Sequence, residues 1–294
     1  MKHVILVNPI SGNKRGEKYA IIVQKLLKKN SIDSVIYIST YPKHITKIVR
    51  ELAIKQECRF YSIGGDGTLN EVVTAIINTN SDIVVIPAGT GNDFVKSVSK
   101  YMSIRKIING SINTKSTKTD VIKLDNEHYC INILNAGFDA LVAKNVEKFK
   151  SIPLISGKMK YNLSIFFTLL SAKNYNFKLR CDNKIFKNKF TLIAIANGKY
   201  YGGGICPCPQ ACINDNTLNI CAISKTNTLE KIIFLPKYKK GKHLNLKHVH
   251  MIDAQNISLV SDKRFPLSID GEIIFTNKLK AKILHAAINI VHIN

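Results

Sequence analysis

Tryptophan is absent from the 294-residue sequence, and acidic residues are few, with twenty Asp and Glu against forty-three Lys and Arg. The resulting net charge of +23 favours an anionic partner, such as a phosphate compound, a nucleic acid or an acidic membrane surface. A nucleic-acid-binding protein is expected to interleave aromatic side chains with its basic patches, and no RNA- or DNA-binding module is recognisable here. We therefore expect no nucleic acid among the partners.

Long hydrophobic runs are missing as well. The longest, such as IFFTLL at 165–170, are far shorter than the roughly 20 residues that a membrane-spanning helix needs. The first residues hold only a short apolar run before Asn8 and Pro9, which does not resemble a signal peptide. With 45% hydrophobic residues and a mean hydropathy of +0.01, the composition is that of a folded soluble protein. We expect a cytoplasmic location.

The cysteines do not suggest a disulfide framework, because there are seven of them and most occur in apolar surroundings. Four lie in or beside apolar stretches, where a reduced thiol acts as a small hydrophobic side chain: Cys58, Cys130, Cys181 and Cys221. The other three, Cys206, Cys208 and Cys212, share the segment CPCPQAC, which could clip a zinc ion but has no convincing fourth ligand nearby. We favour a proline-rich loop with incidental thiols.

The first third of the chain alternates short β-like runs with helical patterns. The β-like runs are HVILVN, SVIYI, RFYSI and DIVVIPA, and the helical patterns cover 19–29, 45–55 and 69–77. This alternation predicts a mainly parallel sheet with helices on its faces, in which ligands bind at the carboxyl ends of the strands. Three loops, NPISG, GGDGT and AGTGN, directly follow predicted strands, so we expect them to meet at one edge of the sheet.

The pattern changes after about residue 118 to consecutive β-like segments with short turns, interrupted by one helix-like insert near 156–171. Such a succession predicts an antiparallel sandwich or barrel. We therefore predict an α/β domain over 1–118, which the C-terminal tail 285–294 could complete, and a larger β-sandwich-like domain over 119–284.

The turn IGGDGTLNEV has the properties of a phosphate site. Its glycines, Gly64, Gly65 and Gly67, let the backbone approach a ligand closely, and the following helix directs its N-terminal N–H groups to the same space. It lacks the Lys-Ser/Thr pair of a Walker P-loop and the spacing of a dinucleotide fingerprint. Residues suited to a polyphosphate recur in the three loops: Ser11, Gly12, Thr68, Thr90, Gly91 and Asn92. For each loop alone, a simple helix cap is the alternative.

The motifs NPISG, GGDGTLNEV, GTGNDF and, far downstream, SIDGE at 268–272 together resemble the catalytic domain of the diacylglycerol kinase family. The whole chain resembles the soluble bacterial lipid kinases more closely, and these are similar to sphingosine and ceramide kinases. The resemblance covers essentially all residues. It implies an ATP:lipid phosphotransferase with an α/β nucleotide-binding domain, a β-rich second domain and an active site in the cleft between them.

Carried onto this sequence, the resemblance assigns ATP contacts to the first two loops, to one residue of YISTYP and to one residue of the third loop. These residues are Asn8, Pro9, Ile10, Ser11, Gly12, Thr40, Gly65, Asp66, Gly67, Thr68, Leu69, Asn70, Glu71 and Thr90. Phosphoryl transfer requires positioning, Mg²⁺ and a group that receives the hydroxyl proton. Asp66 would then bind the Mg²⁺ that sits on the phosphates.

The resemblance implies Glu272 as the general base that takes the proton of the lipid hydroxyl. In the sphingosine kinase branch, the aspartate that matches Asp66 is the candidate for this role, so both residues remain candidates here. From the residues alone, IDGE is an ordinary β-turn with Asp270 and Gly271 as its turn residues.

The resemblance further implies a structural Mg²⁺ bound by the side chain of Asp215 and by the backbone carbonyls of Cys212 and Thr217. The sequence departs from the family pattern here. Asn214 and Asn216 stand where an acidic residue and a glycine are usual, which removes a carboxylate from the surroundings of the metal.

Two segments bear on a lipid partner. The lysine-rich segment 231–250 has no acidic residue and would suit anionic headgroups, with a solvated loop as the alternative. The apolar segment 158–173 could cover an acyl chain, although core packing is the favoured explanation.

The sequence thus indicates a peripherally membrane-associated lipid kinase that uses ATP and Mg²⁺, with diacylglycerol as the leading acceptor. Relatives suggest a homodimer. The alternatives are a kinase of another acceptor, such as a sphingoid base, phosphatidylglycerol or NAD, and a non-catalytic regulator that binds nucleotide or anionic lipid. NAD kinases and phosphofructokinases have a similar GGDGT turn, but the full set of motifs is that of the lipid kinases.

Overall fold

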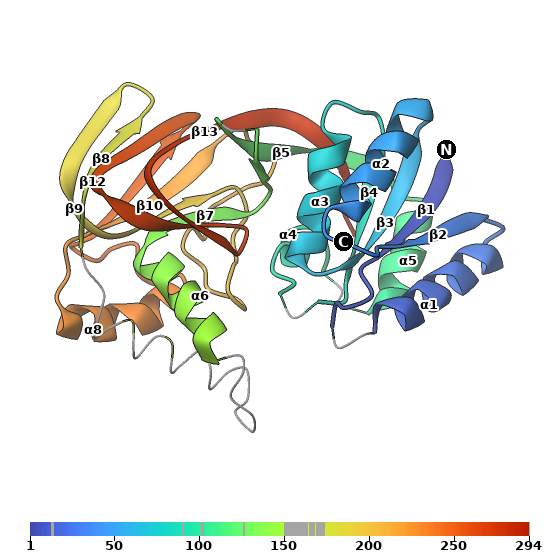
Figure 1. Ribbon diagram of the computed structural model, residues 1–294, viewed down its shortest axis with the longest axis horizontal. Helices are drawn as coiled ribbons and strands as arrows, with labels where there is room; N and C mark the ends of the chain where they lie inside the picture. The colour runs from blue at the N-terminus through green and yellow to red at the C-terminus, as the bar shows by residue number, and fades with distance from the viewer. Residues whose placement is uncertain are drawn as a thin grey trace. The chain divides into compact units, whose positions relative to one another are not determined.

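The computed structural model divides the chain into two compact units (Figure 1). Unit 1 consists of Met1–Val121, Ile213–Asn216 and Leu284–Asn294, and unit 2 consists of Ile122–Cys212 and Thr217–Ile283. The structure describes residues 1–12, 15–89, 91–100, 103–125, 127–149, 164, 168 and 174–293. The helix-like insert expected near 156–171 and the apolar segment 158–173 lie outside the described residues, except for positions 164 and 168.

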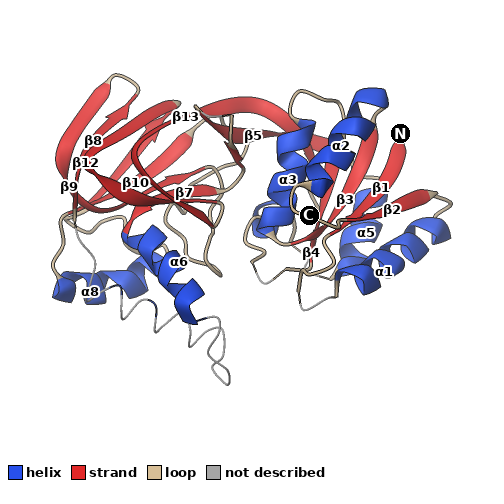
Figure 2. Ribbon diagram, viewed as in Figure 1, coloured by secondary structure: helices blue, strands red, loops and turns tan. Residues whose placement is uncertain are grey.

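Unit 1 shows the alternation of strands and helices that the sequence predicts. Its first strands are β1 (Lys2–Val7), β2 (Ser34–Ile38), β3 (Cys58–Gly64) and β4 (Asp82–Pro87). The helices α1 (Gly16–Lys29), α2 (His44–Lys55) and α3 (Asp66–Ile76) follow the first three strands in turn (Figure 2). Two helices that the sequence analysis did not anticipate, α4 (Val95–Val98) and α5 (Ile104–Ile112), follow β4. The three expected helices and four expected strands are confirmed.

The register of these strands brings the ends of all four to one edge. β1 pairs in parallel with β2 and with β3, and β3 pairs in parallel with β4. Val7, the last residue of β1, lies opposite both Ile38 and Ile63, and Gly64 lies opposite Pro87. The loops that follow the strands therefore leave the sheet side by side.

Helices cover both faces of this sheet (Figure 1). On one face, α1 and α5 pack against the strands. This core cluster includes Ile5, Val7, Ala20, Val23, Leu27, Tyr61, Ile63, Val84, Ile86, Ile107 and Ile108. On the other face, α2 and α3 lie next to each other, and their sequences follow the helical spacing that buries one side, as in Ile45, Ile48 and Val49 of α2.

Unit 2 is rich in antiparallel sheet and carries two helices that the sequence analysis missed. Its strands include β6 (Tyr129–Cys130), β7 (Ile133–Gly137), β8 (Tyr175–Cys181), β9 (Lys184–Ala196), β10 (Leu218–Ser224), β11 (Val249–Ala254) and β12 (Asn256–Ile269). The missed helices are α6 (Phe138–Phe149) and α8 (Thr228–Lys239). β5 (Ser116–Leu124) and β13 (Glu272–Val291) each have residues in both units.

Long strands organise unit 2. β9 and β12 each pair with β8 through their first halves and with β7 through their second halves. β12 is one long strand, NISLVSDKRFPLSI, with an irregularity between Val260 and Phe265 in its pairing with β13. A bulge lets one strand bend and change partners without a turn. The sheet encloses a core that contains Leu134, Leu179, Ile193, Ile220, Leu259 and Phe265.

Among the residues that the structure describes, no helix is both long enough and apolar enough to cross a bilayer.

Candidate functional site

The three glycine loops meet at the carboxyl edge of the unit 1 sheet, as the sequence predicts. A Cβ atom on Gly12 of the first loop would lie 1.7 Å from the carbonyl oxygen of Ala88, just after β4. A Cβ on Gly89 would lie 2.4 Å from the Cα of Gly65, and one on Gly65 would lie 2.8 Å from the carbonyl oxygen of Gly91. Because only glycine allows such close backbone approach, these positions bring the loops together.

Backbone hydrogen bonds join the second and third loops. The N–H groups of Ala88 and Gly89 donate to the Gly64 carbonyl at 2.9 and 3.1 Å, and the Asp66 N–H donates to the Gly91 carbonyl at 3.1 Å. Within the third loop, the Asn92 side chain accepts from the Gly89 N–H at 3.0 Å, and its amide donates back to the Gly89 carbonyl. The two loops are thus held in one fixed arrangement.

Asn8 ties the first loop to the start of α3. Its side-chain amide donates to the hydroxyl of Thr68 at 3.3 Å, and its side-chain oxygen accepts from the Ile10 N–H at 3.2 Å. The Asn8 backbone carbonyl accepts from the Ser11 N–H at 3.1 Å. The two side-chain bonds explain why an asparagine opens the NPISG motif.

The Asp66 carboxylate lies at the first residue of α3 and faces the third loop. It accepts hydrogen bonds from the backbone N–H groups of Asp93, at 3.1 Å, and Phe94, at 3.3 Å. These two bonds fix the orientation of the Asp66 carboxylate. An anion at this position is favoured by the positive end of the α3 dipole.

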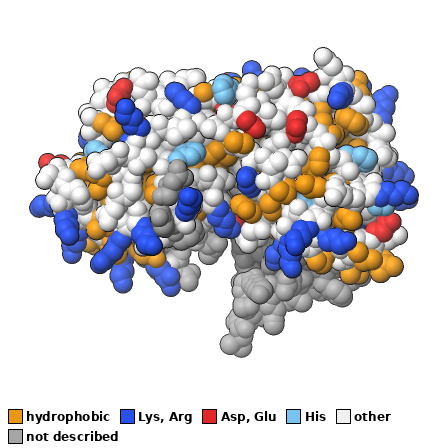
Figure 3. Space-filling view, turned by 180° about the vertical axis from the view of Figure 1, so that it is seen from behind, with side chains coloured by type: hydrophobic (Ala, Val, Ile, Leu, Met, Phe, Trp, Pro, Cys, Tyr) orange, Lys and Arg blue, Asp and Glu red, His pale blue; other side chains and the backbone are white. Residues whose placement is uncertain are grey.

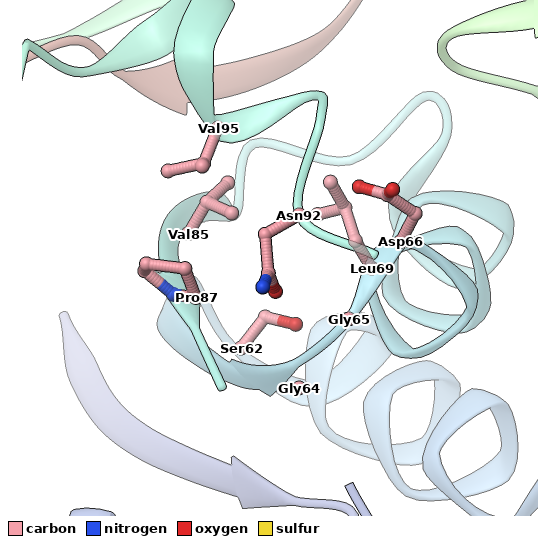
Figure 4. Close-up of a pocket in the computed structure, with 9 residues that line it drawn as sticks. All are labelled: Ser62, Gly64, Gly65, Asp66, Leu69, Val85, Pro87, Asn92 and Val95. Carbon is pink, nitrogen blue, oxygen red and sulfur yellow. The ribbon is translucent and has the colours of Figure 1, made fainter. Parts of the chain in front are cut away.

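A narrow pocket lies below these loops, and Figure 4 shows the Asn92 amide pointing into it toward Ser62. The lining residues come from β3, β4, the third loop and the starts of α3 and α4: Ser62, Gly64, Gly65, Asp66, Leu69, Val85, Pro87, Asn92 and Val95.

Asp93 is a residue of this site that the sequence analysis did not select. Its side chain is buried and forms an ion pair with Lys96 at 2.6 Å, while its N–H holds Asp66. Asp93 and Lys96 both belong to the stretch GTGNDFVK, of which the sequence analysis considered the glycines, Thr90 and Asn92.

Of the other expected nucleotide contacts, Thr40 lies at the same sheet edge, and Leu69, Asn70 and Glu71 lie in α3. The Ser39 N–H donates to the Val7 carbonyl at 2.9 Å, which places the following Thr40 at the sheet edge beside the first loop. The Thr40 hydroxyl and N–H lie 3.2 and 3.1 Å from His44 Nδ1. The Glu71 carboxylate accepts a hydrogen bond from the N–H of Thr46, a residue of α2, at 3.4 Å. Thr90 lies outside the described residues.

Glu272 opens strand β13 in unit 2, directly after a tight hairpin. Ile269 pairs with Glu272, so the turn consists of Asp270 and Gly271, with φ angles of 46° and 98°. Two consecutive residues with positive φ are typical of a type I′ hairpin, for which Asp-Gly is a favoured sequence. Glu272 is exposed at the end of this hairpin, where a substrate could reach its carboxylate.

Asp270 fixes this hairpin to a distant part of unit 2. Its carboxylate accepts three consecutive backbone N–H groups, those of Ile131, Asn132 and Ile133, at 2.8, 3.1 and 3.1 Å. It also accepts from the Cys130 thiol at 3.1 Å, and burial together with the Asp270 charge raises the pKa of that thiol. The sequence predicts only a turn role for Asp270, but this residue also positions the strand that begins with Glu272.

Ile213–Asn216, the part of the expected metal-binding segment that belongs to unit 1, is held by Asp120, a residue that the sequence does not single out. The buried Asp120 carboxylate accepts from the Asn216 N–H at 2.7 Å, from the Ala286 N–H at 2.7 Å and contacts His285 Nδ1 at 2.9 Å. The Asp120 N–H donates to the Ile213 carbonyl at 2.7 Å. Asp215 is exposed, directly before the Asn216 N–H that binds Asp120.

The three thiols of the CPCPQAC loop differ in exposure. Cys206 and Cys208 are buried and Cys212 is exposed, and the Cys208 thiol donates to the Asn219 carbonyl at 3.3 Å. Within the described ranges, no group of three or more His, Cys, Asp or Glu side chains is arranged to hold a metal ion. The zinc alternative for this loop therefore gains no support from the described residues.

Unit 2 also contains a buried carboxylate with two tyrosine partners. Asp139, the second residue of α6, accepts hydrogen bonds from the hydroxyls of Tyr201 and Tyr238, the latter at 2.8 Å. Burial raises the pKa of Asp139 to about 6, although both tyrosine hydroxyls act in the opposite direction. Because this carboxylate titrates near neutral pH, it couples the stability of unit 2 to pH.

Two family models match consecutive parts of the chain. The diacylglycerol kinase catalytic domain matches residues 2–124, and the YegS C-terminal NAD kinase beta sandwich-like domain matches residues 132–292. The first match contains the three glycine loops, and the second contains the Asp270–Glu272 hairpin.

Curated relatives and solved structures agree with these matches. A Staphylococcus carnosus protein named "Putative lipid kinase" is 28% identical over 80% of this chain and 77% of its own length. A Staphylococcus aureus (strain MSSA476) protein, also named a putative lipid kinase, is 27% identical over 88% of this chain and 86% of its own. The crystal structure of a putative diacylglycerol kinase from Bacillus anthracis has the same fold, with a TM-score of 0.79, 22% identity and coverage of 99% and 97%. The chain therefore belongs to the family of the YegS C-terminal NAD kinase beta sandwich-like domain, whose model matches more than half of it, and a diacylglycerol kinase catalytic domain match precedes that domain.

Proposed function

We propose that this protein is an ATP-dependent lipid kinase that transfers the γ-phosphoryl group to a lipid hydroxyl, with diacylglycerol as the leading acceptor and phosphatidic acid as the product. The observation that carries the proposal is the convergence of three glycine loops on the N-terminus of α3, in the part of the chain that matches the diacylglycerol kinase catalytic domain. The proposal rests on the chemistry of that edge and on the lipid-kinase names of the relatives.

The loops suit the phosphates of ATP. Their backbone approaches itself so closely at Gly12, Gly65 and Gly89 that no side chain intervenes, so a phosphate could come close to the backbone there. A helix N-terminus adds further N–H groups and the positive end of its dipole. The residues proposed to contact the nucleotide are those of the first two loops with Thr40, Asn70, Glu71 and Thr90.

Asp66 fits as the ligand of a catalytic Mg²⁺. Its carboxylate is an oxygen donor of the kind that Mg²⁺ prefers, and the Asp93 and Phe94 N–H groups fix its orientation. When bound, the metal would neutralise negative charge on the phosphates. At the second proposed Mg²⁺ site, the exposed Asp215 carboxylate and the carbonyls of Cys212 and Thr217 would be the ligands, and Asp120 holds that segment in place.

Glu272 is the proposed general base. The lipid hydroxyl oxygen would form a bond to the γ-phosphorus as the bond to the ADP oxygen breaks, and the hydroxyl proton would pass to the Glu272 carboxylate. Asp66 is the alternative acceptor of this proton. That the catalytic centre lies between the two predicted domains, 1–118 and 119–284, stays a prediction.

The lipid acceptor implies a membrane partner. We propose peripheral association with an anionic membrane from the cytoplasmic side, in keeping with the net charge of +23. A homodimer and the absence of a nucleic-acid partner stay expectations from the sequence.

The proposal is tested with radiolabelled γ-phosphate ATP and a panel of lipids in anionic vesicles. The panel would hold diacylglycerol, a sphingoid base, ceramide and phosphatidylglycerol, with NAD and fructose 6-phosphate in parallel reactions. We expect label in phosphatidic acid. Label in another lipid would change only the acceptor. Label on NAD with none in lipid, or nucleotide binding with no transfer at all, would overturn the proposal in favour of the NAD kinase or the non-catalytic regulator.

A further inference from the structure

Helix α8 buries a lysine and exposes apolar side chains, whereas an ordinary surface helix does the reverse. Its inward face carries Lys231, Phe234 and Tyr238, and Lys231 is only 4% exposed. Its outward face carries Leu229, Ile232 and Ile233, which are 67%, 52% and 59% exposed. Lysine is among the residues that proteins rarely bury, and isoleucine is among those they bury most often.

The inward face of α8 is fully engaged, so the helix cannot turn over to hide its isoleucines. Phe234, Tyr238 and His243 form a ring cluster with centroid distances of 4.8 to 5.9 Å. The Tyr238 hydroxyl donates to the buried Asp139. At the N-terminus, Asn227 and Glu230 form a reciprocal capping box at 2.7 and 2.8 Å.

The outward residues form one continuous stripe. Leu229, Ile232, Ile233 and the exposed Pro236 are spaced i, i+3, i+4 and i+7, the spacing that places side chains on one side of a helix. An exposed apolar patch of this kind usually marks a surface for a partner.

Lysines flank both ends of the stripe, and their positive charge indicates an anionic partner. Lys225 precedes the helix, and the exposed Lys237, Lys239, Lys240 and Lys242 follow the stripe. The single acidic residue of α8, Glu230, is occupied by its capping bond and lies 3.4 Å from His248. Figure 3 shows that Lys and Arg side chains also outnumber Asp and Glu on the face of the molecule turned away from Figure 1.

We infer that α8 docks on an anionic bilayer, with the apolar stripe Leu229, Ile232, Ile233 and Pro236 inserted among the headgroups and the flanking lysines on the phosphates. An apolar face bordered by lysines is the pattern of a helix that lies in the plane of a membrane interface. The inference deepens the proposed function, because it names the element that brings a lipid kinase to its substrate.

The absence of Trp from the chain allows a direct test, since a single introduced Trp reports its own surroundings. Ile233→Trp is mixed with phosphatidylglycerol vesicles, without ATP or diacylglycerol. We expect a blue-shifted emission that brominated lipids quench. Ile54→Trp, at an 81% exposed isoleucine of α2 in unit 1, is the matched control and should keep the emission of a water-exposed Trp.

Vesicle sedimentation measures the strength of docking. Ile232→Ser/Ile233→Ser should reduce partition to anionic vesicles by about tenfold or more, because each serine removes apolar surface from the interface. Lys239→Gln/Lys240→Gln should reduce it by about fivefold per lysine at low salt. Ile21→Ser/Ile54→Ser, which removes two exposed isoleucines of unit 1, should match the unmodified protein.

Two outcomes would overturn the inference. Equal partition of the α8 variant and the unit 1 control would show that the stripe does not enter the bilayer. A lower molecular mass of the α8 variant by light scattering in vesicle-free buffer would show that a second copy of this chain covers it. Since no step uses ATP, a failure here is distinct from a failure of the kinase proposal, which the radiolabel assay tests on its own.

Discussion

Gly12 and the Ala88 carbonyl lie so close that any side chain on Gly12 would overlap the carbonyl oxygen. Gly12 also has a φ of +58°, a conformation that non-glycine residues adopt only at a cost of about 1–3 kcal/mol. The contact therefore depends on glycine in two independent ways, and it joins the loop after β1 to the loop after β4.

We expect Gly12→Ala to separate these loops and to weaken nucleotide binding by at least about tenfold, because a loss of about 1.4 kcal/mol corresponds to that factor. Calorimetric titration with ATP would measure the affinity, and urea unfolding would measure stability. Gly67→Ala is the control for stability, since its Cβ would meet nothing within 4 Å. An unchanged affinity in Gly12→Ala would show that the loop contact is not needed for the nucleotide.

Asp66→Asn should reduce turnover by at least about a hundredfold while the protein stays folded. Asparagine retains one oxygen that can accept an N–H bond, so only one of the bonds from Asp93 and Phe94 is lost, at about 1 kcal/mol. Turnover in the radiolabel assay is compared with the urea midpoint. A loss of activity that only mirrors a loss of folded protein would remove Asp66 from the chemistry.

Glu272→Gln should reduce turnover by at least about a hundredfold by a different route, because glutamine cannot accept a proton. The pH dependence of kcat separates the two candidate bases. If Glu272 is the base, the residual activity of Asp66→Asn keeps the acidic limb of the pH profile, whereas that of Glu272→Gln loses it. The reverse pattern would assign the proton to Asp66. Full activity in Glu272→Gln would exclude this residue from the mechanism.

Asp270→Asn tests whether the hairpin before Glu272 is held from a distance. Asparagine would present a donor where the carboxylate now accepts from Ile131, Asn132 and Ile133, so we expect a loss of about 1–3 kcal/mol in the free energy of unfolding. We also expect kcat to fall while the KM for ATP is retained, since the nucleotide loops lie in unit 1.

Asp262→Asn is the matched control for this change. The exposed Asp262 carboxylate accepts long side-chain hydrogen bonds, from the Asn176 amide at 3.4 Å and the Ser261 hydroxyl at 3.3 Å. Asp262→Asn should change the free energy of unfolding by less than about 0.5 kcal/mol. Equal losses in the two variants would contradict the positioning role of Asp270.

Asp139 should make unfolding depend on pH. Its folded pKa, about 6, lies above its ordinary value of 3.8, so the folded protein binds more protons between these values than the unfolded chain does. Stability from this group is therefore present at low pH and declines as pH rises from about 4 to about 6. The difference in unfolding free energy between the unmodified protein and Asp139→Asn should shift by on the order of 2–3 kcal/mol over that range. A constant difference would show that Asp139 ionises normally.

The meeting of the glycine loops could be predicted from the sequence, because parallel pairing alone places consecutive strand ends at one edge. The contacts of Asp270 could not. Its partners, Ile131 to Ile133, are far away in sequence, and nothing near Asp270 distinguishes a turn aspartate from one that holds another strand. Helix α8 was missed for a related reason, since its exposed Ile232 and Ile233 and its buried Lys231 break the usual helical pattern of apolar residues.

The path of β13 constrains the order in which the chain can fold. This strand begins at Glu272 in unit 2, and Asn289 and Ile290 near its end pair with Asp82 and Ile83 of β4. Val291 and Ile293 then complete the apolar core of unit 1. On the ribosome these residues are made after all of unit 2. Unit 1 is therefore synthesised first, but its apolar core and the β4 edge of its sheet stay incomplete until unit 2 and then residues 284–294 have been made.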